Sequence, residues 1–178
     1  MKHVALLRGI NVGGKNILPM KDLAAMFVAA GCRDVTTYIQ SGNVVFSAAA
    51  GTLKKMPATI AAKVADDFGY RVPVIVRSHE ELSIVIRRNP FLNPEAYQKI
   101  LHVAFLADAP GAEAISKLDP DRSPPDRFAV IGRDVFLHLP NGGGNTKLTN
   151  AWLDSKLSTV STVRNWATIL KLHEMTQV

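Results

Sequence analysis

Apolar positions along the chain follow two different spacings. Residues 3–7, 44–47 and 72–78 are short runs rich in apolar and β-branched side chains, a pattern typical of buried strands. Residues 20–30 and 53–68 instead place apolar side chains every three or four positions, which predicts amphipathic helices. A glycine follows each of these two helical segments, as expected where a helix ends in the left-handed conformation.

The order of the elements predicts an α+β fold. Residues 3–77 are predicted to form β-α-β-β-α-β, with Pro57 in the first turn or so of the second helix. Residues 100–157 are predicted to form β-α-β-β-α, and a closing helix is expected to begin at Thr162 as its N-cap. Each half therefore matches the ferredoxin-like β-α-β-β-α-β type unit.

We predict two such units, at residues 1–88 and 89–178, with an extra C-terminal helix. Ser78 and Glu81 form a capping-box pattern at the start of the helix that links the units, before the segment 89–94. The element order is consistent with an internal duplication, although inspection of the sequence reveals no repeat of individual residues.

Composition places the chain among globular cytoplasmic proteins. It has 178 residues, 47% of them hydrophobic, which is enough to form a core. No stretch approaches the roughly 20 apolar residues that span a bilayer, and the N-terminus lacks a signal-peptide core. Cys32 is the single cysteine, which excludes an internal disulfide. Because it follows a helix-ending glycine, we expect a packed thiol and not a nucleophile.

The net charge of +6 is unevenly distributed. Residues 1–100 contain 13 Lys and Arg against 7 Asp and Glu, whereas residues 101–178 contain 8 of each. A basic front part can attract phosphate-bearing partners, or it can be an ordinary solvated surface. Because the charges are scattered, the pattern alone favours the solvated surface.

Residues 9–15 have the G-x-x-x-x-G-K spacing of a P-loop. Two features argue against a nucleoside triphosphatase: Asn16 replaces the Ser or Thr that binds Mg²⁺, and Pro19 obstructs a helix beginning at Lys15. The helix is expected to begin at Pro19, which leaves a long loop rich in cations, glycines and amides. Such a loop suits an anion, although glycine turns of this composition also occur without ligands.

Two further polar segments are candidates for the same site. The first is the turn Gln40-Ser41-Gly42-Asn43, and the second is Arg164-Asn165 in the expected first turn of the last helix. Lys147, which follows the glycine-rich segment 141–145, is a further candidate for this site. Turn chemistry is the simpler explanation for the first, and a core position is the simpler explanation for Trp166. No metal-ligand spacing occurs among the five histidines, and no nucleophile elbow is present.

Several long segments closely resemble a known bacterial family. These are "VALLRGINVGGKNILPMKDL", "VTTYIQSGNVVF" and "TVRNWATILKL", which are similar to the signatures of the family called domain of unknown function 1697. The resemblance implies an α+β fold with internal duplication and no established reaction. Family members often have Ser-Lys where this chain has Thr146-Lys147. The family's recurrent residues correspond here to Arg8, Gly9, Asn11, Gly13, Gly14, Met20, Tyr38, Gln40, Ser41, Gly42, Asn43, Lys147, Arg164, Asn165 and Trp166.

The sequence leaves three functions open. The first is recognition of a phosphate-bearing ligand, such as a nucleotide or nucleic acid, through the loop after the first strand. The second is an enzyme acting on a small phosphorylated or carboxylated metabolite, and the third is a protein-interaction module. No cofactor, metal or membrane partner is implied. The candidate ligand-binding residues are Arg8, Asn11, Gly13, Gly14, Lys15, Asn16, Gln40, Ser41, Asn43, Lys147, Arg164 and Asn165.

Overall fold

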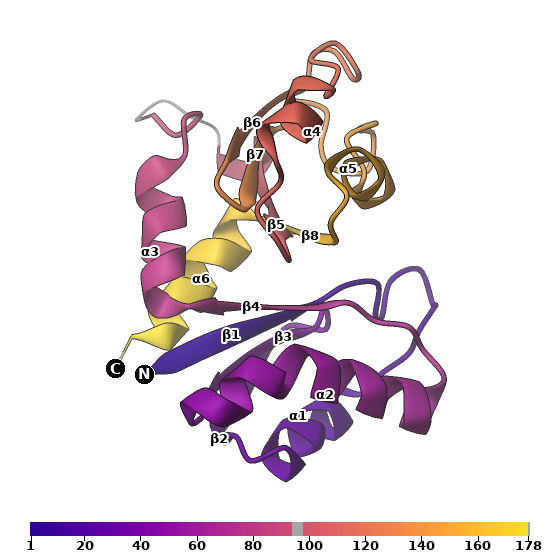
Figure 1. Cartoon of the computed structure of the whole chain (residues 1–178), viewed down its shortest axis with the longest axis vertical. Helices are drawn as coiled ribbons and strands as arrows, with labels where there is room; N and C mark the ends of the chain where they lie inside the picture. The colour runs from indigo at the N-terminus through magenta and orange to yellow at the C-terminus, as the bar shows by residue number, and fades with distance from the viewer. Residues whose placement is uncertain (94–97, 178) are drawn as a thin grey trace. The chain divides into compact units, whose positions relative to one another are not determined.

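Two four-stranded antiparallel sheets, each packed with helices, make up the α+β fold (Figure 1). The structure is a computed structural model that describes residues 1–93 and 98–177. Pro94, at the end of the expected linker, lies outside the described residues. One compact unit consists of Met1–Ser83 and Lys171–Val178, and the other is Ile84–Leu170. These units are defined by contacts within the folded chain, whereas the predicted domains, 1–88 and 89–178, would be units that each fold on their own. The predicted division at residue 88 therefore stays a prediction.

The first sheet has the strand order β2-β3-β1-β4, and the helices α1 and α2 lie on one of its faces (Figure 1). This order and the alternation of strands and helices are those of the ferredoxin-like unit, as predicted. The elements are β1 (Lys2–Leu7), α1 (Met20–Ala29), β2 (Arg33–Tyr38), β3 (Asn43–Ser47), α2 (Ala50–Phe68), β4 (Val74–Ser78) and α3 (His79–Arg88).

The second sheet repeats this plan with the order β6-β7-β5-β8. A short 3-10 helix η1 (Gln98–Ile100) precedes it. Its elements are β5 (Leu101–Leu106), α4 (Ala112–Ser116), β6 (Arg127–Ile131), β7 (Asp134–His138), α5 (Asn150–Leu157), β8 (Ser161–Asn165) and α6 (Trp166–Thr176). The boundary between the two compact units falls within α3 and within α6.

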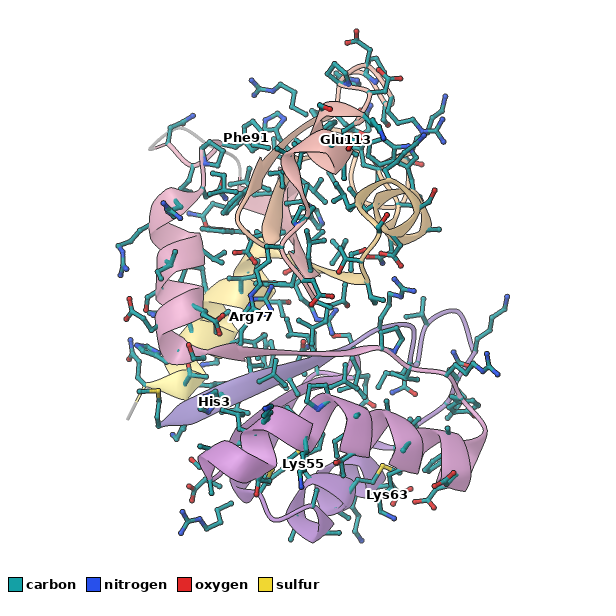
Figure 2. The ribbon with its side chains drawn as sticks, in the orientation of Figure 1. His3, Lys55, Lys63, Arg77, Phe91 and Glu113 are labelled. Atoms are coloured by element: carbon teal, nitrogen blue, oxygen red, sulfur yellow. The ribbon has the colours of Figure 1, made fainter. Side chains whose placement is uncertain are left out.

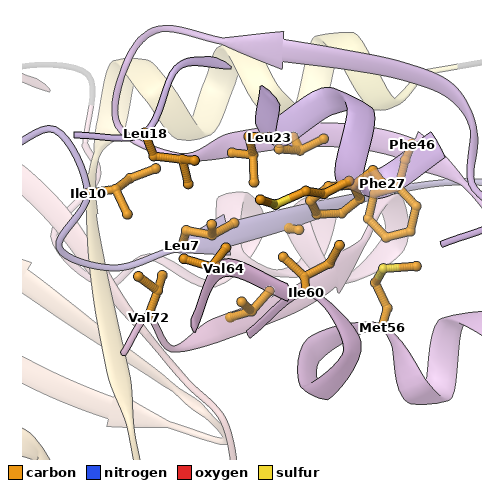
Figure 3. Packing of buried hydrophobic residues seen from close by; sticks show 14 of the residues in the cluster. Leu7, Ile10, Leu18, Leu23, Phe27, Phe46, Met56, Ile60, Val64 and Val72 are labelled. Carbon is orange, nitrogen blue, oxygen red and sulfur yellow. The ribbon is translucent and has the colours of Figure 1, made fainter. Parts of the chain in front are cut away.

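The hydrophobic core of the first unit lies between its sheet and the helices α1 and α2. Leu7 on β1 and Phe46 on β3 point toward Phe27 on α1 and Ile60 and Val64 on α2, and all five side chains are fully buried (Figure 3). Burial of side chains of this size supplies the main stabilising free energy of such a layer, about 1.5–3 kcal/mol for each. The predicted helical faces are therefore the ones that form the core.

Two local predictions are wrong. Pro57 lies inside α2, since that helix begins at Ala50 and not at Leu53, so the proline is beyond the first turn. The segment expected to cap the last helix at Thr162 is the strand β8, and α6 begins only at Trp166. The backbone N–H and C=O groups of residues 161–165 are hydrogen-bonded through the pairing of β8 with β5. This pairing is a long-range interaction, so the local propensity of the segment does not predict it.

The predicted capping box at α3 is confirmed. The Glu81 N–H donates to Ser78 Oγ over 3.1 Å, and the Ser78 N–H donates to Glu81 Oε2 over 2.8 Å. Two N–H groups at the start of α3 are thereby satisfied reciprocally. In α6 the corresponding position is Asn165, whose Oδ1 accepts from the Thr168 N–H over 2.8 Å.

The strand pairings show a repeat of individual residues between the two units. His3 pairs with Ser78 and Leu7 with Val74 in the first sheet, whereas His102 pairs with Asn165 and Leu106 with Ser161 in the second. Aligning the two sheets by this register places "HVALL" at 3–7 on "HVAFL" at 102–106, and "VR" at 76–77 on "VR" at 163–164. The duplication expected from element order is thus matched by side chains at equivalent register positions.

Candidate anion-binding surface

Both ends of the loop between β1 and α1 are anchored in the core. Ile10 is 1% exposed and Leu18 is fully buried, and both belong to the core of the first unit (Figure 3). Between them the chain leaves the core, since Val12 is 63% and Ile17 is 54% exposed. The loop is therefore a surface projection whose two ends are held in place.

The outermost part of this loop is a small β-hairpin. Val12 and Lys15 form an antiparallel bridge, and the Lys15 N–H donates to the Val12 carbonyl over 3.0 Å. Gly13 and Gly14 have φ angles of +58° and +72°, and a type I′ turn requires positive values at both positions. The two glycines thus turn the chain and present Lys15 on an exposed hairpin.

This hairpin differs from a P-loop. In a P-loop the lysine lies at the start of a helix whose N-terminal N–H groups face the phosphates. Here α1 begins at Met20, with Pro19 as its N-cap, and Lys15 belongs to the hairpin that precedes it. The G-x-x-x-x-G-K match is therefore one of spacing alone, and the predicted helix start near Pro19 is confirmed.

Two asparagines hold the loop in shape. Asn11 Nδ2 donates to the carbonyls of Leu18 and Gln40, each over 2.9 Å, and Asn11 Oδ1 accepts from the Leu18 N–H over 2.8 Å. Asn16 Nδ2 donates to the Gly9 carbonyl over 2.8 Å. Both residues have positive φ, which asparagine tolerates better than most residues. These atoms serve the loop's own conformation, and direct ligand contacts by Asn11 and Asn16 stay a prediction.

The turn between β2 and β3 is bound to this loop by the Asn11–Gln40 hydrogen bond. Asn43 is fully buried, and its Nδ2 donates to the Tyr38 carbonyl over 3.1 Å and to Ser41 Oγ over 2.9 Å. Ile39 is 49% exposed with a φ of +48°, an unusual backbone conformation for a β-branched residue. Strained positions of this kind concentrate at functional surfaces.

Three segments meet at one end of the first sheet. Residues 8–19 contact residues 39–42 through the Asn11–Gln40 bond, and they contact residues 69–73 through the Arg8 N–H, which donates to the Pro73 carbonyl over 3.1 Å. We call these three segments the cationic end. They contain Arg8, Lys15 and Arg71 and no Asp or Glu. Among the described residues, Lys15 and Arg71 make no side-chain hydrogen bond or ion pair, and both are exposed.

Arg71 was missed by sequence reasoning. It lies in the connection before β4, more than 50 positions from Lys15, and only the pairing of β1 with β4 brings the two segments together. The predicted topology could have identified Arg71. In a split βαβ unit the last strand runs antiparallel to the first, so the residues that precede the last strand lie beside those that follow the first.

Lys147 and Asn165 are exposed residues of the second unit. The Lys147 backbone N–H donates to Ser123 Oγ over 3.0 Å, which holds the chain just after the glycine-rich segment 141–145. Asn165 ends β8 and caps α6. A site shared by these residues and the cationic end stays a prediction.

Arg164 is a buried residue of β8 and not part of a helical turn. Its Nη1 donates to Thr162 Oγ1 and to the Val163 carbonyl, both over 2.9 Å. Burial lowers the pKa of this guanidinium to about 10, so it remains protonated at neutral pH. Arg77 has the equivalent register position in the first sheet and is also buried, which indicates that the repeated fold itself retains an arginine here.

Cys32 does not have the environment of a reactive nucleophile. Cys32 is buried, and burial raises the pKa of its thiol, which disfavours the reactive thiolate. Among residues 1–93 and 98–177, no group of three His, Cys, Asp or Glu side chains is arranged to hold a metal ion.

None of the helices in the described part of the chain combines the length and the hydropathy that a bilayer-spanning segment requires.

Three histidines make stability depend on pH. Burial lowers the pKa of His3, His102 and His138 below the ordinary 6.5, and His3 (Figure 2) and His138 each have a buried Nδ1 without a hydrogen-bond partner among the described residues. Below pH 6.5 the unfolded chain therefore binds more protons than the folded chain. We expect the free energy of unfolding to be constant from pH 8 to about 6.5 and to decrease as the pH falls further.

Urea unfolding at pH 7.5, 6.5 and 5.5 measures this dependence. The centroids of the His3 and Phe46 rings lie 6.0 Å apart, so phenylalanine at position 3 replaces one ring by another. His3→Phe removes one of the three titrating groups, so the free energy of unfolding of this variant should depend less steeply on pH. A free energy of unfolding that is unchanged or higher at pH 5.5 would contradict the expectation.

Comparisons with known proteins agree with the fold. A family model described as "Protein of unknown function (DUF1697)" matches residues 1–136. The solved structure titled "The structure of conserved bacterial protein SP0830 from Streptococcus pneumoniae" is similar with a TM-score of 0.69 and 20% sequence identity, covering 99% of this chain and 98% of that one. At this identity the similarity shows the fold alone. No curated protein matches the sequence significantly.

Proposed function

The chain belongs to the DUF1697 family, whose function is unknown, and we propose that it recognises a phosphate-bearing ligand at the cationic end of its first sheet. The proposal is supported by one observation: the three adjoining segments together contain Arg8, Lys15 and Arg71 and not a single carboxylate. A local excess of positive charge of this kind attracts phosphate groups. The ligand-binding role of these residues and the cytoplasmic location are both proposals.

The shape of the surface favours a nucleic acid over an enclosed small molecule. Lys15 projects from the tip of a hairpin and Arg71 from a neighbouring exposed connection. Cations on a projecting surface can each contact a different phosphate of a polymer backbone, whereas a single metabolite is usually held in a concave pocket. Base-stacking aromatics are absent from the three segments apart from Tyr70, so we expect binding with little sequence preference.

A second candidate is a protein-interaction surface. Val12, Ile17 and Ile39 are exposed apolar side chains of the same loop and turn. Exposed apolar groups close to the exposed cations Lys15 and Arg71 suit a partner with an acidic, partly apolar surface. This alternative predicts that polynucleotides compete poorly with the natural partner.

The test is the salt dependence of polynucleotide binding. Fluorescence anisotropy with a labelled single-stranded RNA of about 20 nucleotides would be measured from about 50 to 300 mM salt. We expect Lys15→Ala combined with Arg71→Ala to weaken binding about tenfold and to reduce the slope of log Kd against log salt by about 1.4, which is about 0.7 for each lost phosphate contact.

The matched control removes the same charge elsewhere on the first unit. Lys54→Ala combined with Lys55→Ala alters an exposed pair on α2, where Figure 2 labels Lys55. This control should bind RNA nearly as the unaltered protein does. Equal losses in the two double variants would mean diffuse attraction, and no measurable binding at about 50 mM salt would exclude nucleic acid as the ligand. Stabilisation by a mononucleotide that requires Lys15 would instead favour the metabolite enzyme.

A further inference from the structure

The outer strand of the second sheet has an open edge. β6 pairs with β7 on one side only, since the sheet has the order β6-β7-β5-β8. Two residues join β6 to β7, so Ile131 and Asp134 form the hydrogen-bonded pair next to the turn. Hydrogen-bonded and non-hydrogen-bonded pairs alternate from there, so the N–H and C=O groups of Phe128 and Val130 point away from β7. The outer side of β6 therefore presents two peptide donors and two peptide acceptors.

The neighbouring segments leave these peptide groups uncovered. Among residues 1–93 and 98–177, the outward N–H and C=O groups of Phe128 and Val130 have no hydrogen-bond partner. The segment before β6 bonds within itself, since the Asp126 N–H donates to the Ser123 carbonyl over 2.7 Å. Open peptide groups along a strand are the feature to which another strand adds in an antiparallel or parallel pairing.

The equivalent edge of the first sheet is protected. The register that aligns the two sheets places Ala129 of β6 on Thr36 of β2. In β2 the pairing shifts between Arg33 and Thr36, and Asp34 inside that shift has a φ of +53°. A bulge, charged residues and polar side chains are means by which proteins protect an edge strand from pairing. β6 instead pairs with β7 without a shift, and every residue after the first is apolar.

We propose that β6 pairs antiparallel with β6 of a second copy of this chain, about a two-fold axis. One register uses every outward peptide group: Phe128 pairs with Val130 of the second copy, and Val130 pairs with Phe128 of the second copy. This register forms four hydrogen bonds and places the two Ala129 residues opposite each other at the axis. The inference concerns the second unit and is independent of the function proposed for the cationic end.

The side chains of β6 suit this register. Phe128 opposite Val130 is an aromatic and β-branched pair, a favourable combination across antiparallel strands. Both side chains pack against the core of the second unit, so the pairing continues this apolar layer from one copy into the other. The two Ala129 residues form a non-hydrogen-bonded pair, whose Cα atoms are only about 4.5 Å apart, and alanine fits there without crowding.

Charge on β6 is compatible with a second copy. Arg127 at the start of the strand is its only charged residue, and its guanidinium lies over the Phe91 ring, 5.2 Å from the centroid. In the proposed register the two Arg127 residues are four positions apart along the paired strands, which is about 13 Å. Because this distance exceeds the Debye length of about 8 Å at physiological ionic strength, their repulsion is largely screened.

Sedimentation velocity from about 5 to 500 µM protein tests the association. A pair of five-residue strands buries less surface than a permanent dimer interface, so we expect a reversible dimer with a Kd of about 10–100 µM. A protein that stays monomeric at about 500 µM would overturn the proposal and leave the open edge to a strand of a different protein.

Two substitutions at Ala129 test the register. Ala129→Lys or Ala129→Glu places two like charges directly opposite each other at the axis, so each variant alone should dimerise at least about tenfold more weakly. An equimolar mixture of the two variants should associate again, because lysine then faces glutamate. Thr36→Lys alters the exposed, equivalent position of β2 and should dimerise as the unaltered protein does. Circular dichroism verifies that each variant is folded.

Hydrogen exchange of the unaltered protein gives a readout that requires no substitution. The amides of Phe128 and Val130 should exchange rapidly in dilute protein and slowly at high concentration, whereas the amides of the central strand β5 should be protected at both. Equally fast exchange of the two amides at both concentrations would overturn the proposal. Dimers that the Ala129 variants leave unchanged, or that Thr36→Lys weakens as much, would also overturn it.

Discussion

Gly42→Ala is expected to lower the free energy of unfolding by about 3 kcal/mol, the sum of a strained backbone and an overpacked core. Gly42 has a φ of +79°, which alanine adopts only with strain. A Cβ at this position would lie 2.8 Å from Leu7 Cβ and 2.9 Å from Ile10 Cδ1. Both neighbours are buried, and Leu7 Cβ is attached directly to the backbone, so the contact cannot be relieved by a rotamer change.

The control separates strain from crowding. Gly132→Ala alters a hairpin glycine of the second unit with a φ of +62°, where nothing lies within 4 Å of the added Cβ. That variant should lose only about 1 kcal/mol, the conformational part. Urea unfolding followed by circular dichroism measures both, and hydrogen exchange in β1 and β3 reports the local effect. Equal losses at the two glycines would refute the crowding argument.

Asn11→Asp is expected to cost about 2–3 kcal/mol, because it replaces a donor that serves two carbonyl groups by an acceptor. Asn11 Nδ2 lies 2.9 Å from the carbonyl oxygens of Leu18 and of Gln40. A carboxylate oxygen there would face two carbonyl oxygens at hydrogen-bond distance, so two attractions become two repulsions. Aspartate tolerates positive φ about as well as asparagine, so the backbone conformation itself is not the cause of the loss.

The same exchange at Asn16 is the matched control. Asn16 Nδ2 donates to a single carbonyl, that of Gly9, in an exposed position. Asn16→Asp should therefore cost about 1 kcal/mol or less while adding the same negative charge to the loop. Thermal and urea unfolding compare the two. If the losses were equal, the added charge and not the lost donor would be responsible.

If the cationic end binds RNA, the two asparagine variants should also differ there. Both lower the net charge of the loop by one, so both weaken electrostatic binding. Asn11→Asp additionally releases the bond to the turn at Gln40, which holds two of the three segments together. Its RNA affinity should therefore fall further than that of Asn16→Asp.

The repeat of individual residues escaped sequence inspection because it is short and widely spaced. "HVALL" and "HVAFL" stand 99 positions apart, and the matching "VR" pairs are separated from them by connections of unequal length. Only the register of β1 with β4 and of β5 with β8 aligns the two sets. Different surfaces are built on this repeated frame, since Ser78 and Glu81 close the start of α3, whereas Asn165 borders a pocket at the start of α6.

The sequence by itself determined the local elements. Apolar spacing placed α1 and the strands β1, β3 and β5, turn chemistry placed the hairpins, and Ser78 with Glu81 marked the start of α3. These features depend on neighbours within four residues, so a single sequence contains them. The family and the ferredoxin-like element order followed from the same local information.

Features that depend on residues far apart in the chain were decided only by the tertiary structure. Residues 161–165 form β8 because β5 supplies their hydrogen-bond partners, although their own composition also suits a helix start. Arg71 adjoins the loop of Lys15 because β4 pairs with β1. His102 and Trp166 line one pocket because β8 pairs with β5. In these two sheets, strand pairing joins residues 55 to 75 positions apart through backbone groups that every residue carries. The spacing of side chains along the chain therefore does not reveal which surfaces the pairing creates.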